Sequence, residues 1–177
     1  MSFLDIIRQI NRKRLINRKA RLFKSEDIPQ KRNHTPKEKV KRLLLLHSQG
    51  GWGDFLYFSG LVRCLIHKGL TVTIGTSPDL IPRLSQLPFN LQIFDATSHN
   101  PLDSTQFDCV LDVDWVVNRH HSLTTVKSLN CWSITCSDVL SKLNLFDQYI
   151  DFSTKAHMSK RYALVVETLT GQPCSPV

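Results

Sequence analysis

From residue 42 onward, short apolar runs alternate with longer stretches in which apolar side chains recur at helical spacing. Five runs have the length of strands, and they predict strands over 42–48, 71–76, 91–95, 107–115 and 131–136. The first run contains Leu43 to Leu46 without a polar interruption. Such a run is typical of a strand buried on both faces of a parallel sheet.

The stretches between the strands predict helices over 54–68, 78–87, 123–129 and 156–169. The first helix is expected to end at Gly69, which can adopt the left-handed backbone of a C-terminal cap. The second is expected to begin with Ser77 as its N-cap and Pro78 at its first position, and the last to end near Gly171 and Pro173. Because helices separate the strands, the pattern predicts an α/β fold with a doubly wound, mostly parallel, Rossmann-like sheet.

The net charge of +8 is distributed unevenly along the 177 residues. Residues 1–42 hold 14 Lys and Arg against 4 Asp and Glu, whereas residues 43–177 hold 9 against 11. The predicted folded body is therefore slightly acidic, and we expect no nucleic-acid partner for it. We divide the chain into a basic arm with a linker, residues 1–41, and a Rossmann-like domain, residues 42–177.

The arm combines an apolar stripe with a basic flank. The apolar side chains that share one side of a predicted helix are Phe3, Leu4, Ile6, Ile7 and Ile10, and the basic side chains after them are Arg12, Lys13, Arg14, Arg18 and Lys19. A helix of this kind over residues 1–24 can lie in the headgroup region of an anionic membrane. A solvated, frayed extension is the equal alternative.

The cysteines and the apolar runs bear on the compartment. The five cysteines, Cys64, Cys109, Cys131, Cys136 and Cys174, are scattered and contain no Cys-x-x-Cys pair. This pattern is typical of reduced, structural thiols in the cytosol. No signal peptide is visible, and no run approaches the ~20 apolar residues that span a bilayer. We expect a cytoplasmic protein that is soluble or peripheral on the membrane.

The first predicted strand runs into a turn with Gly50, Gly51 and Gly53, and Asp54 opens the helix that follows. A turn without side chains lets a ligand approach the backbone closely. The turn is not a P-loop, because no Gly-Lys-Ser/Thr follows, and it is a poor dinucleotide fingerprint, because Leu56 stands where the third glycine belongs. Asp54 would repel a phosphate but can accept a proton from a neutral hydroxyl. Two roles stay open for it, a residue that stabilises the helix dipole or a general base.

Residues 50–54 read Gly-Gly-Trp-Gly-Asp, and residues 61–65 read Leu-Val-Arg-Cys-Leu. These motifs resemble the N-terminal signature of the lipopolysaccharide heptosyltransferases, glycosyltransferase family 9, in which an apolar strand leads into Gly-Gly-x-Gly-Asp and then Leu-x-Arg-x-Leu. The similarity continues more loosely. Residues 107–112 resemble the family's Asp-x-Val-Leu-Asp strand, and residues 157–164 resemble its late helix with His-x-x-x-Arg-Tyr-x-Ala-Leu.

The resemblance implies the N-terminal, acceptor-binding half of a GT-B glycosyltransferase, with the donor-binding half expected about where this sequence stops. The position that matches the family's base is Asp54, which would deprotonate an acceptor hydroxyl during transfer with inversion. Gly50, Gly51, Trp52 and Gly53 would contact the acceptor. Trp52 departs from the family, which usually has a smaller aliphatic residue there.

The resemblance also implies the partners. They are a nucleotide-sugar donor similar to ADP-heptose and a lipopolysaccharide core acceptor at the inner face of the bacterial inner membrane, with no metal or other cofactor. Two alternatives stay open. The chain is an inactive remnant that at most binds acceptor, or it is a non-enzymatic adaptor on a membrane surface.

Two weaker motifs could hold a metal ion. Asp112 and Asp114 end a predicted strand on one face, as in the Asp-x-Asp motif of GT-A glycosyltransferases, although acidic residues at strand ends are common. His120 and His121 lack the spacing of a helical zinc pair and are expected to be surface residues.

Overall fold

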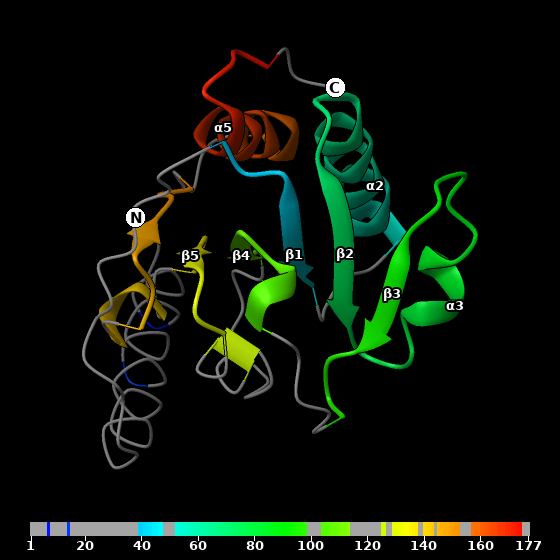
Figure 1. Cartoon of the computed structure of the whole chain (residues 1–177), viewed down its shortest axis with the longest axis horizontal. Coiled ribbons are helices and arrows are strands. Elements are labelled where there is room, and N and C mark those ends of the chain that lie inside the picture. Colours follow the sequence, from blue (N-terminus) through cyan, green and yellow to red (C-terminus); the bar gives the residue numbers. More distant parts are fainter. Residues whose placement is uncertain are drawn as a thin grey trace.

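The chain folds around one parallel sheet. The computed structural model describes residues 7, 14, 39–47, 52–98, 104–113, 125–126, 129–137, 140–143, 145–152 and 157–174. Within them the sheet has six strands in the order β3-β2-β1-β4-β5-β6, and every neighbouring pair is parallel (Figure 1). The strands are β1 (Arg42–Leu46), β2 (Thr71–Thr76), β3 (Gln92–Asp95), β4 (Cys109–Asp112), β5 (Trp132–Thr135) and β6 (Gln148–Tyr149). This strand order is that of the Rossmann fold, which confirms the predicted fold class.

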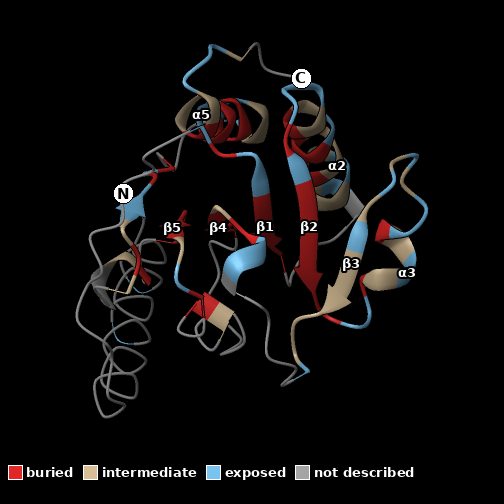
Figure 2. Ribbon diagram, viewed as in Figure 1, coloured by how far each residue is buried: buried red, intermediate tan, exposed pale blue. Residues whose placement is uncertain are grey.

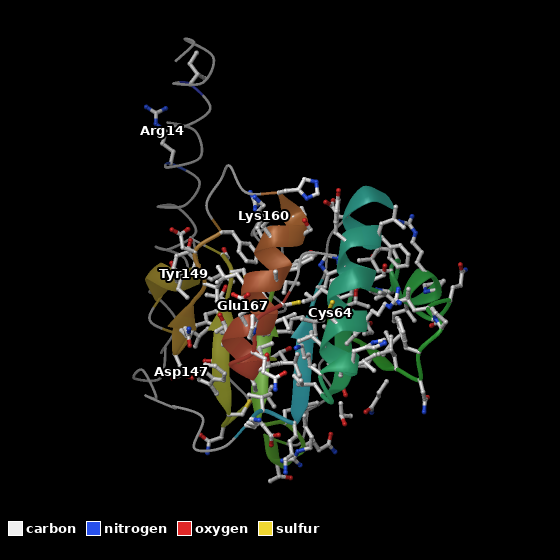
Figure 3. The ribbon with its side chains drawn as sticks, turned by 90° about the horizontal axis from the view of Figure 1, so that it is seen from above. Arg14, Cys64, Asp147, Tyr149, Lys160 and Glu167 are labelled. Carbon is white, nitrogen blue, oxygen red and sulfur yellow. The ribbon has the colours of Figure 1, made fainter. Side chains whose placement is uncertain are left out.

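Helices α2 and α5 cover one face of this sheet. The helices are α2 (Trp52–His67), α3 (Ile81–Leu84) and α5 (Met158–Thr170), with the 3-10 helices η1 (Ser104–Gln106) and η2 (Leu140–Leu143). Helices α2 and α5 pack against each other and lie side by side in both views (Figures 1 and 3). No helix in the described part of the chain is both long and apolar enough to cross a membrane.

The central strand β1 is buried on both faces. Leu43 and Leu45 belong to the apolar core that contains α2 and α5, whereas Leu44 and Leu46 belong to a second core on the opposite face. All four side chains are at most 2% exposed. Figure 2 shows the same contrast across the sheet, with the central strands buried and the edge strand β3 largely intermediate. The expectation from the uninterrupted run of leucines is confirmed.

Most predicted elements are present. Strand β2 has the predicted bounds, and β1, β3, β4 and β5 lie within their predicted segments. Helix α2 begins at Trp52, two residues before the predicted start, and Gly69 follows it with φ +85°, as its predicted role requires. Helix α5 ends at Thr170, and its C-cap is Gly171, whose backbone is left-handed and whose N–H donates to the carbonyl of Glu167 at 2.8 Å.

The helix predicted over 78–87 is much shorter than expected. Helix α3 contains only Ile81–Leu84, and Leu80 occupies the N-cap position without a side-chain hydrogen bond, so Ser77 does not cap it. The physical reason is Pro82, which lacks an N–H and is accommodated only in a first helical turn. The start of the helix therefore moves to residue 81.

The other segments are covered only in part. In the helix predicted over 123–129, Thr125 and Val126 are helical, Leu129 is not, and the other positions lie outside the described residues. Strand β6 was not predicted, because its two residues are too few to make a pattern. In the predicted arm helix, the described residues are Ile7 and Arg14, both helical and exposed.

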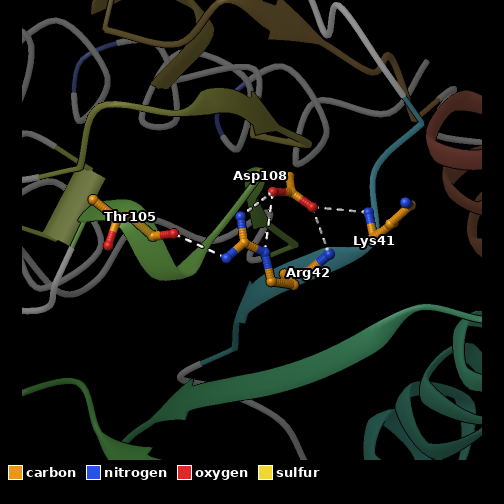
Figure 4. A network of polar contacts seen from close by, with 4 residues as sticks. All are labelled: Lys41, Arg42, Thr105 and Asp108. Carbon is orange, nitrogen blue, oxygen red and sulfur yellow. Dashed lines mark hydrogen bonds and ion pairs between the residues drawn. The ribbon is translucent and has the colours of Figure 1, made fainter.

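A network around Asp108 joins β1 to the segment that leads into β4 (Figure 4). Its Oδ2 accepts hydrogen bonds from the backbone N–H groups of Lys41 at 3.0 Å and Arg42 at 2.8 Å. Its Oδ1 accepts from Nη2 of Arg42 at 2.6 Å, and Nη1 of Arg42 donates to the carbonyl of Thr105 at 3.0 Å. One carboxylate thus fixes where β1 begins relative to β4.

The Asp108 network should make stability depend on pH. Partial burial acts to raise the pKa of Asp108, but hydrogen bonds from Arg42 and Lys41 outweigh it and lower this pKa below its ordinary value. The stabilisation is therefore complete above the unfolded-state pKa of about 3.9 and is lost as pH falls through the lower folded-state pKa. We expect Asp108→Asn to lower the urea midpoint at pH 7, with a difference from wild type that shrinks below about pH 4.

The control is Asp151→Asn, which changes an exposed aspartate that accepts a 3.2 Å hydrogen bond from Tyr149. A loss of stability in Asp108→Asn that stays the same from pH 7 to pH 3 would contradict the electrostatic account.

Candidate functional site

The direction of winding reverses between β1 and β4, which are neighbours at the centre of the sheet. From β1 the chain continues to β2 on one side, and from β4 it continues to β5 on the other. Doubly wound sheets bind their ligands beyond the carboxyl ends of the strands at this point. Asp54 lies in the first turn of α2, the helix that follows β1, and its side chain is partly exposed. The candidate base thus lies where this fold places ligands and is accessible to solvent.

The glycine-rich segment is arranged differently from the prediction. Gly53 belongs to the first turn of α2 and not to the preceding turn, because the helix already begins at Trp52. Gly50 and Gly51 lie outside the described residues, as does the side chain of Trp52. Gly53 is therefore the predicted acceptor-binding residue whose surroundings can be assessed.

Gly53 and Gly75 differ in what their missing side chains allow. A Cβ atom at Gly53 would meet no atom of the described residues within 4 Å, apart from its chain neighbours and its own helix backbone, so the described part of the fold does not require a glycine at this exposed position. A Cβ atom at Gly75 in β2 would lie 2.8 Å from Leu46 and 2.9 Å from Phe94. Sheet packing therefore favours a glycine at position 75, whereas no side chain among the described residues fills the space beside Gly53.

A second group of polar side chains lies beside Asp54. Tyr57 is three residues further along α2 and so lies next to Asp54 on the helix surface. Its hydroxyl is 3.1 Å from Nε2 of His157, and the two rings meet edge to face with centroids 5.2 Å apart. His157 is the N-cap of α5. The fold thus brings the helix that follows the glycine-rich motif against the start of the late helix motif, although the two are about a hundred residues apart in the chain.

The hydrogen bonds of His157 assign its neutral tautomer. Nδ1 of His157 accepts from the N–H of Ser159 at 3.4 Å and lies 2.9 Å from the hydroxyl of Ser159. In the neutral ring the proton is then on Nε2, which donates to the oxygen of Tyr57. The hydroxyl proton of Tyr57 is left to donate elsewhere. The sequence analysis assigned no role to Tyr57 or His157. The feature that could have identified Tyr57 was its position three residues after Asp54 on the same helix.

A groove of about 460 Å³ runs between α2 and α5. Its lining is mostly apolar and consists of Gly53, Leu56, Tyr57, Gly60, Leu61, Cys64, Ser159, Tyr162, Ala163, Val166 and Cys174. Gly53, Tyr57 and Ser159 belong to the helix N-termini, and Cys64 and Cys174 lie toward the opposite helix ends. Asp54 is not among the lining residues, so the groove adjoins the candidate base without containing it.

The alternative metal site finds little support in the geometry. Asp112 is fully buried at the end of β4, and its Oδ2 accepts a 3.0 Å hydrogen bond from the hydroxyl of Thr135. Asp114, His120 and His121 lie outside the described residues. Within the described ranges, no three His, Cys, Asp or Glu side chains are grouped as metal ligands. Asp112 is placed as a structural acceptor between β4 and β5.

The order of the strands and their parallel pairing define a Rossmann-like α/β domain. No protein-family model matches the chain, and no curated protein matches it. Several solved structures overlap it loosely, among them the following two. The hypothetic protein SMU.573 from Streptococcus mutans shares 21% identity at a TM-score of 0.44, with 70% of this chain and 47% of that chain covered. The GtfA/B complex shares 14% identity at a TM-score of 0.41, with 78% of this chain and 30% of that chain covered.

The chain thus spans about half of the first structure and under a third of the second. At these TM-scores neither overlap bears on the activity, and the assignment of the fold rests on the sheet of this chain.

The two glycines give a matched pair of substitutions. Gly53→Ala should leave stability unchanged or raise it by about 0.5–1 kcal/mol, because alanine is the better helix former and its methyl group meets open space. Gly75→Ala should lower stability by about 1–3 kcal/mol, because the methyl group overlaps Leu46 and Phe94. Urea unfolding measures both. A destabilised Gly53→Ala variant would show that the fold itself requires a glycine there.

Proposed function

We propose that this chain is the acceptor-binding, Rossmann-like half of a GT-B glycosyltransferase, and that Asp54 is the general base. The observation that carries the proposal is the position of Asp54. It lies in the first turn of α2, partly exposed, at the edge of the sheet where the winding reverses. The resemblance of residues 50–54 and 61–65 to glycosyltransferase family 9 supports the same role.

The proposed reaction uses Asp54 in one step. The carboxylate takes the proton of an acceptor hydroxyl while that oxygen attacks the anomeric carbon of the sugar donor. The bond from that carbon to the diphosphate breaks on the opposite face, so the anomeric configuration inverts. A general base within hydrogen-bond distance of the hydroxyl increases the rate of transfer about 10²–10⁴-fold.

The neighbours of Asp54 suit the binding of a sugar acceptor. Gly53 leaves space for a ligand beside the helix N-terminus. Tyr57 has a hydroxyl proton to donate, since Nε2 of His157 supplies the hydrogen bond to its oxygen. A carboxylate acceptor and a phenol donor next to each other match a neutral polyol better than they match a phosphate. The donor nucleotide would require a second domain, and transfer is therefore a property proposed for the two halves together.

The finer proposal concerns the substrates. By resemblance to family 9, we propose a heptose donor carried on ADP and an acceptor in the lipopolysaccharide core. The test is an ADP-release assay with deacylated lipopolysaccharide core as acceptor, run with this chain and an added donor-binding domain of the family. No transfer by the wild-type chain in this assay would leave only the binding of acceptor, as expected of an inactive remnant.

Asp54→Asn should lower the turnover number about 10²–10⁴-fold in that assay, because asparagine cannot take the proton. The melting temperature should stay near the wild-type value, because the side chain is partly exposed. Asp151→Asn is the control, since it removes the same charge from an exposed position after β6. An unchanged turnover number in Asp54→Asn would remove Asp54 from the role of base.

We also propose that residues 1–24 hold the protein at an anionic membrane surface, where the acceptor is anchored. Each basic residue near such a surface contributes about 1 kcal/mol, and salt screens this attraction. We expect the full chain to sediment with anionic vesicles at low ionic strength, and binding to fall with salt and on deletion of residues 1–24. Equal binding to anionic and neutral vesicles, or binding that survives the deletion, would contradict the proposal.

A further inference from the structure

Two cysteines far apart in the sequence meet at one end of the groove between α2 and α5. Cys64 lies on α2, and Cys174 follows the left-handed Gly171 that ends α5. Both are half-buried, both pack against the main apolar core, and both line the groove. The thiol of Cys174 lies close enough to Cys64 to raise its pKa. Figure 3 marks Cys64 on the side of α2 that faces α5.

The segment that carries Cys174 is fixed against both helices. The N–H of Cys174 donates to Oε1 of Glu167 on α5 at 3.1 Å. Nζ of Lys68, just after α2, donates to Oε1 of Gln172 at 3.1 Å and lies 3.5 Å from the carbonyl oxygen of Pro173. These contacts tie the segment before the Cys174 thiol to α5 and to Lys68, whose own N–H donates to the carbonyl of Cys64 at 3.0 Å. The thiol is therefore held beside Cys64 by the fold and does not meet it by chance.

We propose that Cys64 and Cys174 are a redox modification site, at which the two thiols form a reversible disulfide that joins the end of α5 to α2. The oxidant is a small disulfide such as glutathione disulfide. One thiolate attacks it, forms a mixed disulfide and releases one glutathione thiolate. The second thiolate then attacks the protein sulfur and releases the second glutathione. Two protein thiols lose two electrons, and one glutathione disulfide gains them.

The surroundings of Cys64 set the pH dependence of this exchange. Burial raises the pKa of Cys64, and the neighbouring Cys174 raises it further, while Arg63 and Lys68 oppose the shift. Because the thiolate is the nucleophile, formation of the disulfide should accelerate as pH rises above neutrality.

The other described cysteines are poorer sites. Cys109 is fully buried in β4, and Cys136 is 2% exposed. Cys131 is half-buried, and burial raises its pKa to about 11. Cys109 and Cys131 lie near enough to influence each other, but the sealed position of Cys109 excludes an oxidant. The pair at the groove differs because both of its thiols border open space.

The first test uses the wild-type chain and needs no substitution. The full chain is equilibrated in a buffer of reduced and oxidised glutathione, quenched with acid, alkylated and analysed by peptide mass mapping. We expect one cross-linked species that joins the peptides of Cys64 and Cys174, and its loss on addition of dithiothreitol. A cross-link between other cysteines, or none at glutathione ratios that oxidise a vicinal dithiol, would overturn the proposal.

Three variants complete the test. Cys64→Ser and Cys174→Ser should lose the intramolecular disulfide, and the remaining thiol of the pair should carry glutathione instead. Cys131→Ser is the matched control, because it removes another half-buried thiol and should keep the cross-link. The disulfide closes a loop of over a hundred residues, so the oxidised wild-type chain should melt on the order of 10 °C higher than the reduced chain. The assignment would be contradicted if Cys64→Ser still gave a cross-linked peptide of the same mass. It would also be contradicted if oxidation raised the melting temperature of that variant as much as that of the wild-type chain.

Discussion

The burial of β1 on both faces is the constraint on which the rest of the structure depends. Its four leucines belong alternately to two apolar cores, so β1 has to lie inside the sheet with a strand on either side. The pairings with β2 and β4 satisfy its backbone, and the carboxylate of Asp108 fixes where the strand begins. The winding of the sheet reverses between β1 and β4, and doubly wound sheets bind ligands at that point. The central position of β1 therefore also determines where a ligand-binding edge can form.

The candidate site follows from this position of β1. The chain leaves β1 at the carboxyl edge of the sheet and enters α2, which brings Asp54 to that edge. Because α2 and α5 lie side by side over one face, the N-cap of α5 places His157 against Tyr57. A carboxylate, a phenol hydroxyl and a glycine at an exposed position thus come together. At the other ends of the two helices, the same packing places Cys64 and Cys174 along one groove.

The local elements of the domain could largely be predicted, because they depend on neighbours in the sequence. The leucine run of β1 and the left-handed glycines after α2 and α5 are examples. The helix over 78–87 was predicted too long, because the position of Pro82 outweighed an apolar spacing that suited a longer helix. Strand β6 was missed because two residues carry no periodic signal, and its pairing with β5 defines it.

By itself the sequence determined the alternation of strands and helices, the burial of β1, the carboxylate at the start of α2 and the concentration of positive charge in the first 42 residues. Only the tertiary structure decided that Asp112 is an internal acceptor for Thr135, and that Tyr57 meets His157. It alone placed Cys64 beside Cys174. The physical reason is the range of the interactions. Periodicity and capping act over a few residues, whereas contacts between helices depend on how a whole sheet stacks them.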